Sequence, residues 1–178
     1  YKSIVIVSAT SAIAEHCAYL WVKNTPIEMI LIGRDRPRLA KVKARLARLN
    51  PQAQLDIVPV DFFDPLKIQA VVNNLTTRGA IDVVLIAQGF LPVQRDCQTD
   101  LALCRETLTI NAISPALFAE AFANILEKQG SGTLAVVGSV ASDRARRTLY
   151  VYGAAKSLMA HYMAGLQHRF ARTAVRCI

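Results

Sequence analysis

The stretch that decides the fold is SIVIVSATSAIA, residues 3–14. Its first half is a short run of Ile and Val, which is typical of a strand buried on both faces. Its second half consists mostly of small and hydroxyl-bearing residues, and apolar residues recur at helical spacing from residue 12 onward. The stretch therefore predicts a strand, a tight turn and the N-terminus of a helix.

The rest of the chain repeats this order of apolar strand and helix. Strands are expected at 3–8, 27–32, 55–60, 81–87, 133–138 and 174–178, and helices at 12–23, 37–49, 65–77, 99–128 (with a bend near Pro115) and 150–171. Apolar strands between helices indicate a parallel sheet with helices on both faces, and right-handed crossovers then give a doubly wound, Rossmann-like α/β fold. We expect residues 1–178 to form a single dinucleotide-binding and catalytic domain, truncated within its sixth strand.

The composition limits the classes of protein to which this chain can belong. Of its 178 residues 53% are hydrophobic and 19% are charged, which excludes a disordered chain. The apolar runs are too short to span a bilayer, and no signal peptide is recognisable, so a cytoplasmic protein is expected. Three histidines and four cysteines have no metal-ligand spacing, and the cysteines are expected to be reduced and mostly buried thiols: Cys17, Cys97, Cys104 and Cys177.

The net charge of +8 is concentrated between residues 34 and 48. Basic residues at positions 38, 41, 45 and 48 form a stripe along one face of the predicted helix at 37–49, so a nucleic-acid or membrane-surface protein is one alternative. A second face of the same helix carries Leu39, Val42, Leu46 and Leu49. A solvated outer face is the simpler interpretation, and no binding to nucleic acid is expected.

The turn after the first strand contains no glycine, although glycine is usual where a dinucleotide pyrophosphate meets a helix N-terminus. Small side chains still allow backbone amides to approach a phosphate, and Thr10 and Ser11 can donate hydroxyl hydrogen bonds. The second strand ends at Gly33 and Arg34. An arginine there favours the 2′-phosphate of NADP over the ribose of NAD, and Asp35 is expected to begin the next helix.

The catalytic prediction rests on Tyr152 and Lys156. Residues four apart share one face of a helix, so the lysine should lie beside the phenol and lower its pKa. Such a tyrosine can donate a proton to a carbonyl oxygen or accept one from an alcohol. Tyr150 is six residues from the lysine and falls on another face. Ser139 ends the preceding strand, where open α/β sheets bind ligands, and can hold the substrate oxygen; Ser142 is a weaker candidate.

These motifs, in this order along the whole chain, resemble the short-chain dehydrogenase/reductase family. In that family the first turn carries three glycines, whose places are taken here by Ser8, Ala12 and Ala14, and an Asn-Asn-Ala-Gly segment is replaced by residues 86–89. The resemblance implies that the catalytic residues are Asn111, which supports a proton-relay water, Ser139, Tyr152 and Lys156. It implies that the cofactor is bound by Ser8, Thr10, Ser11, Ala12, Ile13, Arg34, Asp61, Phe62, Ala87, Gly89, Tyr152 and Lys156.

The expected function is therefore an NADP(H)-dependent oxidoreductase that interconverts a ketone or aldehyde and an alcohol, with Tyr152 as general acid and base. A catalytically inactive dinucleotide-binding regulator is the alternative, supported by the glycine-poor turn. The resemblance also implies a small-molecule substrate and a homodimer or homotetramer built on the two long helices. The loop at residues 143–147 resembles a branch that includes the keto-reductase subunit of the decaprenylphosphoryl-ribose 2′-epimerase. Arg144, Arg146 or Arg147 is a candidate contact for an anionic or lipid-linked sugar substrate.

Overall fold

A six-stranded parallel sheet forms the centre of the protein in a computed structural model, which describes residues 2–23 and 27–178. The strand order is β3-β2-β1-β4-β5-β6, so the chain reverses direction across the sheet between β1 and β4. The strands are β1 (Ser3–Val7), β2 (Glu28–Gly33), β3 (Gln54–Pro59), β4 (Val83–Ile86), β5 (Ser131–Val136) and β6 (Ala174–Cys177). The predicted doubly wound α/β fold is confirmed.

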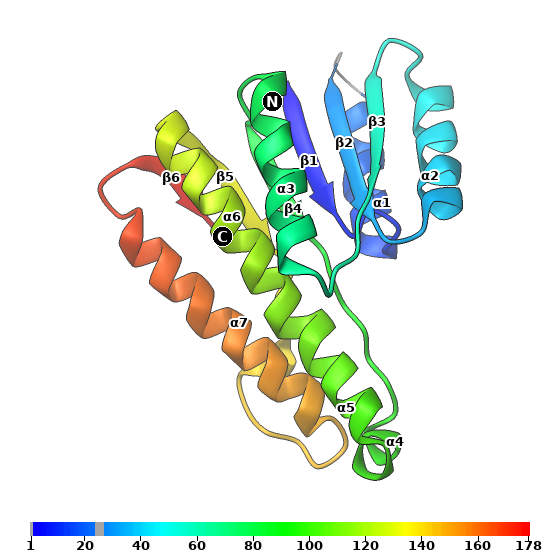
Figure 1. Ribbon diagram of the computed structural model, residues 1–178, viewed down its shortest axis with the longest axis vertical. Helices are drawn as coiled ribbons and strands as arrows, with labels where there is room; N and C mark the ends of the chain where they lie inside the picture. Colours follow the sequence, from blue (N-terminus) through cyan, green and yellow to red (C-terminus); the bar gives the residue numbers. More distant parts are fainter. Residues whose placement is uncertain (1, 24–26) are drawn as a thin grey trace.

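Helices cover both faces of the sheet (Figure 1). One face packs against α1 (Ala12–Val22) and α2 (Arg36–Leu49), and the other packs against α3 (Pro65–Leu75), α6 (Ser114–Gln129) and α7 (Tyr150–Arg169). The parallel strands all end at the edge from which α4 (Gln94–Thr99), α5 (Leu101–Leu108) and the loop before α7 project, in the lower part of Figure 1. This edge is the place where the fold can build a site.

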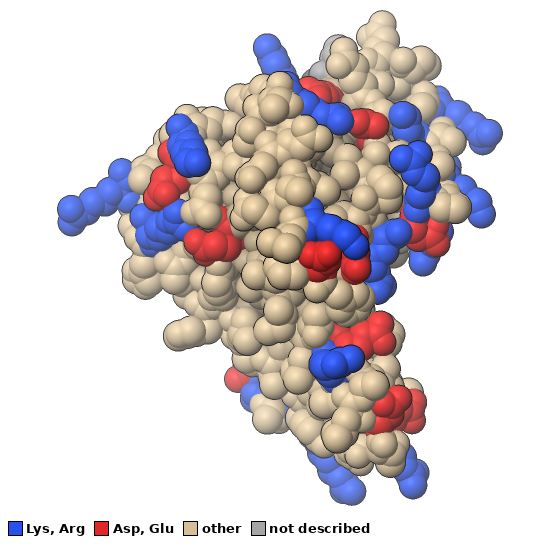
Figure 2. All heavy atoms as spheres, in the orientation of Figure 1, with Lys and Arg blue, Asp and Glu red and all other residues tan. Residues whose placement is uncertain are grey.

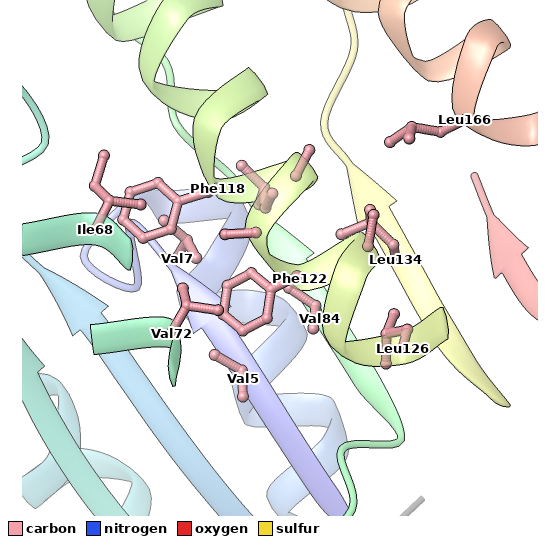
Figure 3. Close-up of a cluster of buried hydrophobic side chains, with 14 of the residues drawn as sticks. Val5, Val7, Ile68, Val72, Val84, Phe118, Phe122, Leu126, Leu134 and Leu166 are labelled. Carbon is pink, nitrogen blue, oxygen red and sulfur yellow. The ribbon is translucent and has the colours of Figure 1, made fainter. Parts of the chain in front are cut away.

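Alternation along β1 divides the core into two clusters. Val5 and Val7 point to the α3, α6 and α7 side, whereas Ile4 and Ile6 point to the α1 and α2 side, and all four are fully buried. Figure 3 shows Phe118 and Phe122 of α6 packed over β1, between the labelled side chains of α3 and β4. Burial on both faces explains why the strands are continuously apolar.

Two aspartates end the loops that lead from β2 and β3 into the next helices. Asp35 caps α2 by accepting from the backbone N–H of Arg38 at 2.9 Å, which confirms its predicted place at the start of that helix. Asp64 caps α3 in the same way, through the N–H groups of Leu66 and Lys67. These caps fix the places at which α2 and α3 begin, beside the carboxyl edge of the sheet.

The helix predicted at 99–128 is more elaborate than the sequence indicated. Thr99, where the predicted helix begins, is the last residue of the separate helix α4. Asp100 then caps α5, which continues through a π-helical segment (Thr109–Ile113) into α6. The π-helical segment ends two residues before Pro115, near the place where the sequence predicts a bend, and proline there has no N–H to donate and crowds the preceding turn. This segment contains Asn111.

By length and hydropathy alone, Leu101–Gln129 is long and apolar enough to cross a membrane, although each apolar run within the chain is short. More than half of its most apolar window is buried inside the protein, as in the core helix of a soluble domain. The stretch is therefore weak evidence for a membrane span.

Other helix ends differ slightly from the predictions. The helix predicted to 77 ends at Leu75 and continues as a 3₁₀ turn (Thr76–Arg78), and α7 ends at Arg169 rather than 171. Leu49 is 39% exposed and so lies outside the buried face of α2 formed by Leu39, Val42 and Leu46. It occupies the last turn of the helix, where the chain leaves the sheet.

Candidate active site

The turn after β1 reaches the N-terminus of α1 through a strained residue. Ser8 has a φ of 63°, and it is the one non-glycine residue with positive φ in the described part of the chain. Ser11 then caps α1, and its Oγ accepts from the N–H of Ala14 at 3.2 Å. Ser8 therefore adopts the backbone conformation that glycine favours, although the sequence has lost that glycine.

Backbone amides at the start of α1 have no hydrogen-bond acceptor within the described chain. They belong to Ala12 and Ile13, the first two residues of α1, since Ser11 Oγ is used by Ala14. Ile13 is 56% exposed, an unusual position for an isoleucine at the carboxyl edge of a buried sheet. Free N–H groups at a helix N-terminus, next to exposed apolar surface, can hold a phosphate and cover part of a cofactor.

Arg34 follows β2 and lies against two aromatic rings. Its guanidinium carbon is 5.8 Å from the centre of the Phe62 ring and 5.9 Å from that of Phe63. The side chain makes no ion pair or hydrogen bond within residues 2–23 and 27–178, so its donors face solvent. The rings restrict the guanidinium while leaving it free to bind an anion.

A hollow of about 330 Å³ lies beside Arg34, lined also by Pro59, Val60 and Asp61. Asp61 Oδ1 accepts from the N–H of Phe63 at 3.0 Å, and its other oxygen lies 4.0 Å from Lys67 Nζ. The Phe62 side chain is only 3% exposed and packs edge-on against Phe118. Of the two residues predicted here, Asp61 presents its side chain to the hollow, whereas the Phe62 side chain belongs to the core.

The end of β4 supplies the next part of the edge. Ala87 is buried and donates to the Val7 carbonyl at 3.0 Å, whereas Gly89 is exposed and has open space where a Cβ would lie. Gln88 between them is 3% exposed, and its Nε2 donates to Ser114 Oγ at 2.7 Å. In the sequence Gln88 is only part of the segment at 86–89 that replaces the Asn-Asn-Ala-Gly of the family. No local sequence pattern indicates that its side chain connects β4 to α6.

Lys156 is the most deeply buried cation of this edge, with 3% exposure. Its Nζ donates to the carbonyls of Val137 at 2.9 Å and Gln88 at 3.2 Å, and it lies 6.0 Å from the centre of the Tyr152 ring. Burial lowers the pKa of the Lys156 ammonium below its ordinary value. The predicted juxtaposition of Tyr152 and Lys156 on one side of α7 is therefore present, between the ends of β4 and β5.

Asn111 lies within the π-helical segment and is fully buried. Its Nδ2 donates to the carbonyls of Phe90 at 2.7 Å and Thr107 at 2.8 Å, and its Oδ1 accepts from the Phe90 N–H at 3.0 Å. Pro115 lies four residues later and cannot donate the ordinary helical bond to the Asn111 carbonyl. The side chain of Asn111 is thus occupied in fixing the loop after β4, and its backbone carbonyl lacks that helical partner.

Ser139 begins a 3₁₀ turn (Val140–Ser142) after β5. Its Oγ accepts from the Ala141 N–H at 3.1 Å, so the hydroxyl proton is left for another acceptor. Ser142 instead donates to the Ser139 carbonyl at 2.6 Å, as expected of a hydroxyl that stabilises the loop. The loop that follows exposes Arg144, Arg146 and Arg147, whose side chains form no ion pair in the described structure.

The four cysteines are free thiols, two of them buried and two half-buried. Among the residues described, no three His, Cys, Asp or Glu side chains are grouped so as to hold a metal ion. The basic face of α2 is exposed, and Leu39, Val42 and Leu46 on its other face are buried. Figure 2 shows these basic groups along the outer edge of the molecule where α2 lies.

The chain is similar to known oxidoreductases in sequence and in fold. The chain is 32% identical over 178 residues to a Streptomyces coelicolor protein named "Uncharacterized oxidoreductase in mprA 5'region", and the match covers 98% of this chain and 69% of that protein. It superposes with a TM-score of 0.88 on the bulky-bulky ketone specific alcohol dehydrogenase from Comamonas testosteroni, at 19% identity, covering 99% of this chain and 70% of that one.

A second solved structure is a putative NAD(P)-dependent gluconate 5-dehydrogenase from Beutenbergia cavernae with bound NADP. It has a TM-score of 0.88 and 20% identity, and the match covers 99% of this chain and 69% of that one. This chain thus spans about two thirds of the length of these proteins. The sequence profile described as short chain dehydrogenase matches residues 2–178, and the chain belongs to the short-chain dehydrogenase family of oxidoreductases.

Proposed function

We propose that the protein is an NADP(H)-dependent oxidoreductase that interconverts a ketone or aldehyde and an alcohol, with Tyr152 as the general acid and base. The observation that carries the proposal is the buried ammonium of Lys156, 6.0 Å from the centre of the Tyr152 ring. A cation held beside a phenol stabilises the negative charge that develops on the phenol oxygen as it gives up its proton, which suits a tyrosine that transfers a proton to and from a substrate.

The residues at this edge fit a dinucleotide phosphate. The free amides of Ala12 and Ile13 suit a pyrophosphate, the space beside Gly89 allows close approach of a ribose, and the hollow beside Asp61 suits an adenine. The unpaired guanidinium of Arg34 favours a 2′-phosphate, and so favours NADP over NAD. When bound, the nicotinamide supplies or accepts the hydride.

The protein's own residues transfer the proton and bind the substrate oxygen. In the reducing direction Tyr152 gives its phenolic proton to the carbonyl oxygen as that oxygen becomes an alcohol, and in the oxidising direction it takes the proton back. Ser139 keeps its proton and donates a hydrogen bond from its hydroxyl to the same oxygen, which stabilises the charge that develops there. The Asn111 carbonyl, released from the helix by Pro115, holds a water that returns the proton from solvent.

Calorimetric titration of the full-length protein with NADPH and NADH tests the cofactor assignment. NADPH is expected to bind more tightly, and Arg34→Ala to weaken NADPH binding about tenfold or more while changing NADH binding little. Arg48→Ala is the matched control, because it removes the same charge from the far end of α2. If the full-length protein binds neither nucleotide, the oxidoreductase proposal is wrong.

The catalytically inactive regulator is not favoured, because the serine, tyrosine and lysine needed for catalysis meet at one edge together with the buried asparagine. Activity on a panel of ketones that is abolished in Tyr152→Phe, with NADPH binding retained, is the expected result. NADPH binding without turnover of any ketone or alcohol in the panel would instead support the regulator.

The substrate is proposed to carry an anionic group near Arg144, Arg146 and Arg147. These three arginines are exposed and unpaired in the described chain, and they lie in the loop that joins Ser139 to the helix carrying Tyr152. A phosphate or carboxylate on a ligand in the site can therefore reach them. A lipid-linked keto-sugar phosphate is one compound of this class.

Dihydroxyacetone phosphate and dihydroxyacetone form a suitable pair of probes for this loop. Arg144→Ala, Arg146→Ala or Arg147→Ala is expected to raise the KM for the phosphorylated ketone about tenfold and to leave that for the neutral ketone unchanged. Arg172→Ala, beyond the other end of α7, serves as the charge-matched control. Equal KM values in all variants would exclude the anion contact.

The assembly is proposed to be a homodimer or homotetramer that uses the long helices α6 and α7. Large apolar side chains are exposed on this side, namely Ile113 (48%), Leu117 (37%) and Leu158 (44%). Sedimentation velocity of the full-length protein is expected to show a species larger than the monomer. A monomer at micromolar concentration would contradict the assignment.

A further inference from the structure

The helix that carries Tyr152 begins without a cap from its own segment. Leu149 stands at the N-cap of α7 with φ −160° and ψ 34°, and a leucine side chain cannot accept a hydrogen bond. The first intrahelical bond runs from the Gly153 N–H to the Leu149 carbonyl at 2.8 Å. The N–H groups of the first turn, including the one directly before Tyr152, therefore need acceptors from elsewhere.

Gln94 supplies one of these acceptors from a distant part of the chain. Its Oε1 accepts from the Val151 N–H at 2.9 Å, across 57 positions in the sequence, and both residues are buried (6% and 8% exposed). Gln94 is the first residue of α4, which packs against α7. Because a buried N–H without a partner is costly, this bond fixes the turn that contains Tyr152.

The orientation of the Gln94 amide follows from this bond. Val151 N–H is a donor, so the atom facing it must be the carbonyl oxygen, and Nε2 points to the other side. Nε2 is buried and has no acceptor within the described residues. Burying an amide N–H without an acceptor destabilises the folded state, and an apolar side chain would fill the same space without this cost. The hydrogen bond accepted by the side-chain oxygen is therefore the structural reason for a glutamine at this position.

We infer that Gln94 is a positioning residue for Tyr152: its side-chain oxygen takes the place of the missing N-cap of α7 and holds the first turn so that the phenol stays beside Lys156. The inference rests on the proposed role of Tyr152. Loss of the bond is expected to affect proton transfer more than cofactor binding, because most of the proposed cofactor contacts, including the free amides of α1 and the Arg34 side chain, lie on elements other than α7.

Gln94→Met removes the acceptor while keeping the length of the side chain. In the full-length protein it is expected to lower kcat for NADPH-dependent reduction of trifluoroacetophenone roughly 5- to 30-fold, the range for loss of a helix cap. The dissociation constant for NADPH should change less than about twofold. Gln98→Met is the matched control, since Gln98 lies on the exposed side of the same helix and should retain wild-type kcat.

Gln94→Glu keeps an acceptor oxygen at the same reach and should restore most of kcat. A residue with only a packing role would give Gln94→Glu no advantage in kcat over Gln94→Met. If Gln94→Met does not fold, Gln94→Asn tests the same bond, because its amide is one methylene too short.

Amide hydrogen exchange at Val151, followed by NMR, gives a readout independent of turnover. Exchange is expected to be slow in the wild type, Gln98→Met and Gln94→Glu, and to rise roughly 5- to 30-fold in Gln94→Met. Unchanged protection, or lost protection with unchanged kcat, would overturn the inference. An inactive wild type with the expected Val151 exchange pattern would instead refute the proposed function, so the two failures are distinguishable.

Discussion

Lys156 Nζ lies 6.0 Å from the centre of the Tyr152 ring and donates to the carbonyl of Val137 at 2.9 Å. The second contact holds the lysine at the end of β5, and the first places its charge beside the phenol. Helix α7 by itself places the two residues on one face, whereas the contact at the end of β5 buries the lysine. The position of the buried charge beside the phenol therefore depends on the tertiary structure. The charge of this lysine should therefore control activity.

Lys156→Met is expected to reduce kcat by about 10²- to 10⁴-fold, because the phenol oxygen loses the positive charge that stabilises it as its proton leaves. In the wild type, burial lowers the pKa of Lys156, so the ammonium loses its proton at a lower pH than an ordinary lysine. The alkaline limb of the kcat profile should lie correspondingly below the usual lysine range. Tyr150→Phe, at a 44% exposed position two residues from the proposed acid, should retain full activity. An unaltered profile in Lys156→Met would contradict this role.

Ser8→Gly is expected to stabilise the protein by up to about 1 kcal/mol, measured by urea unfolding. The left-handed conformation at φ 63° costs a serine about 1–2 kcal/mol, and the greater chain entropy of unfolded glycine cancels part of the gain. Ser8→Ala keeps the Cβ and should show no comparable gain. If both substitutions give the same stability, the backbone at this turn is not strained.

Gly153→Ala should reduce both stability and activity. A Cβ at this position would meet the Ala141 carbonyl oxygen at 3.0 Å, so α7 would have to move away from the turn that begins at Ser139. Crowding of this kind typically costs about 1–3 kcal/mol, and kcat should fall about tenfold as the tyrosine and serine separate. Ala154→Ser, at the exposed neighbouring position, should be nearly neutral in thermal unfolding and in kcat. Wild-type behaviour of Gly153→Ala would show that the two elements are not tightly apposed.

Arg169→Gln tests a set of polar contacts that joins α6 to α7. Arg169 pairs with Glu120 at 2.9 Å and Glu127 at 2.6 Å, and Glu120 also accepts from the hydroxyl of Tyr162. The Arg169 guanidinium lowers the pKa of Glu127, so the stabilisation from this pair is present above about pH 4.5 and is lost as the pH falls through the lowered pKa.

Differential scanning calorimetry should show this dependence on pH. The variant is expected to have a lower Tm than the wild type at pH 7, and the difference should shrink toward pH 3 as the carboxylates become protonated. Arg172→Gln, which removes an exposed arginine nearby, is the control for the change in net charge. A difference that does not vary with pH would mean that the ion pairs contribute nothing to it.

Much of the fold follows from local sequence. Short Ile and Val runs that alternate with helical segments indicate strands of a sheet covered on both faces, and residues such as Leu39, Val42 and Leu46 give α2 one buried face. Asp35, placed directly before a proline-containing helix, is a cap by its chemistry alone. The spacing of Tyr152 and Lys156 similarly fixes their shared side of a helix, because helical geometry depends on neighbours in sequence.

The sequence by itself therefore determined the order of strands and helices, and the residue types that can transfer a proton. Only the tertiary structure decided that Gln94 caps α7, that Gln88 connects β4 to α6, and that the Phe62 side chain belongs to the core. These contacts join residues dozens of positions apart, and no local pattern records them. The physical reason is that hydrogen-bond partners and burial depend on which surfaces the packed sheet brings together, whereas helix and strand periodicity depends on the backbone of adjacent residues.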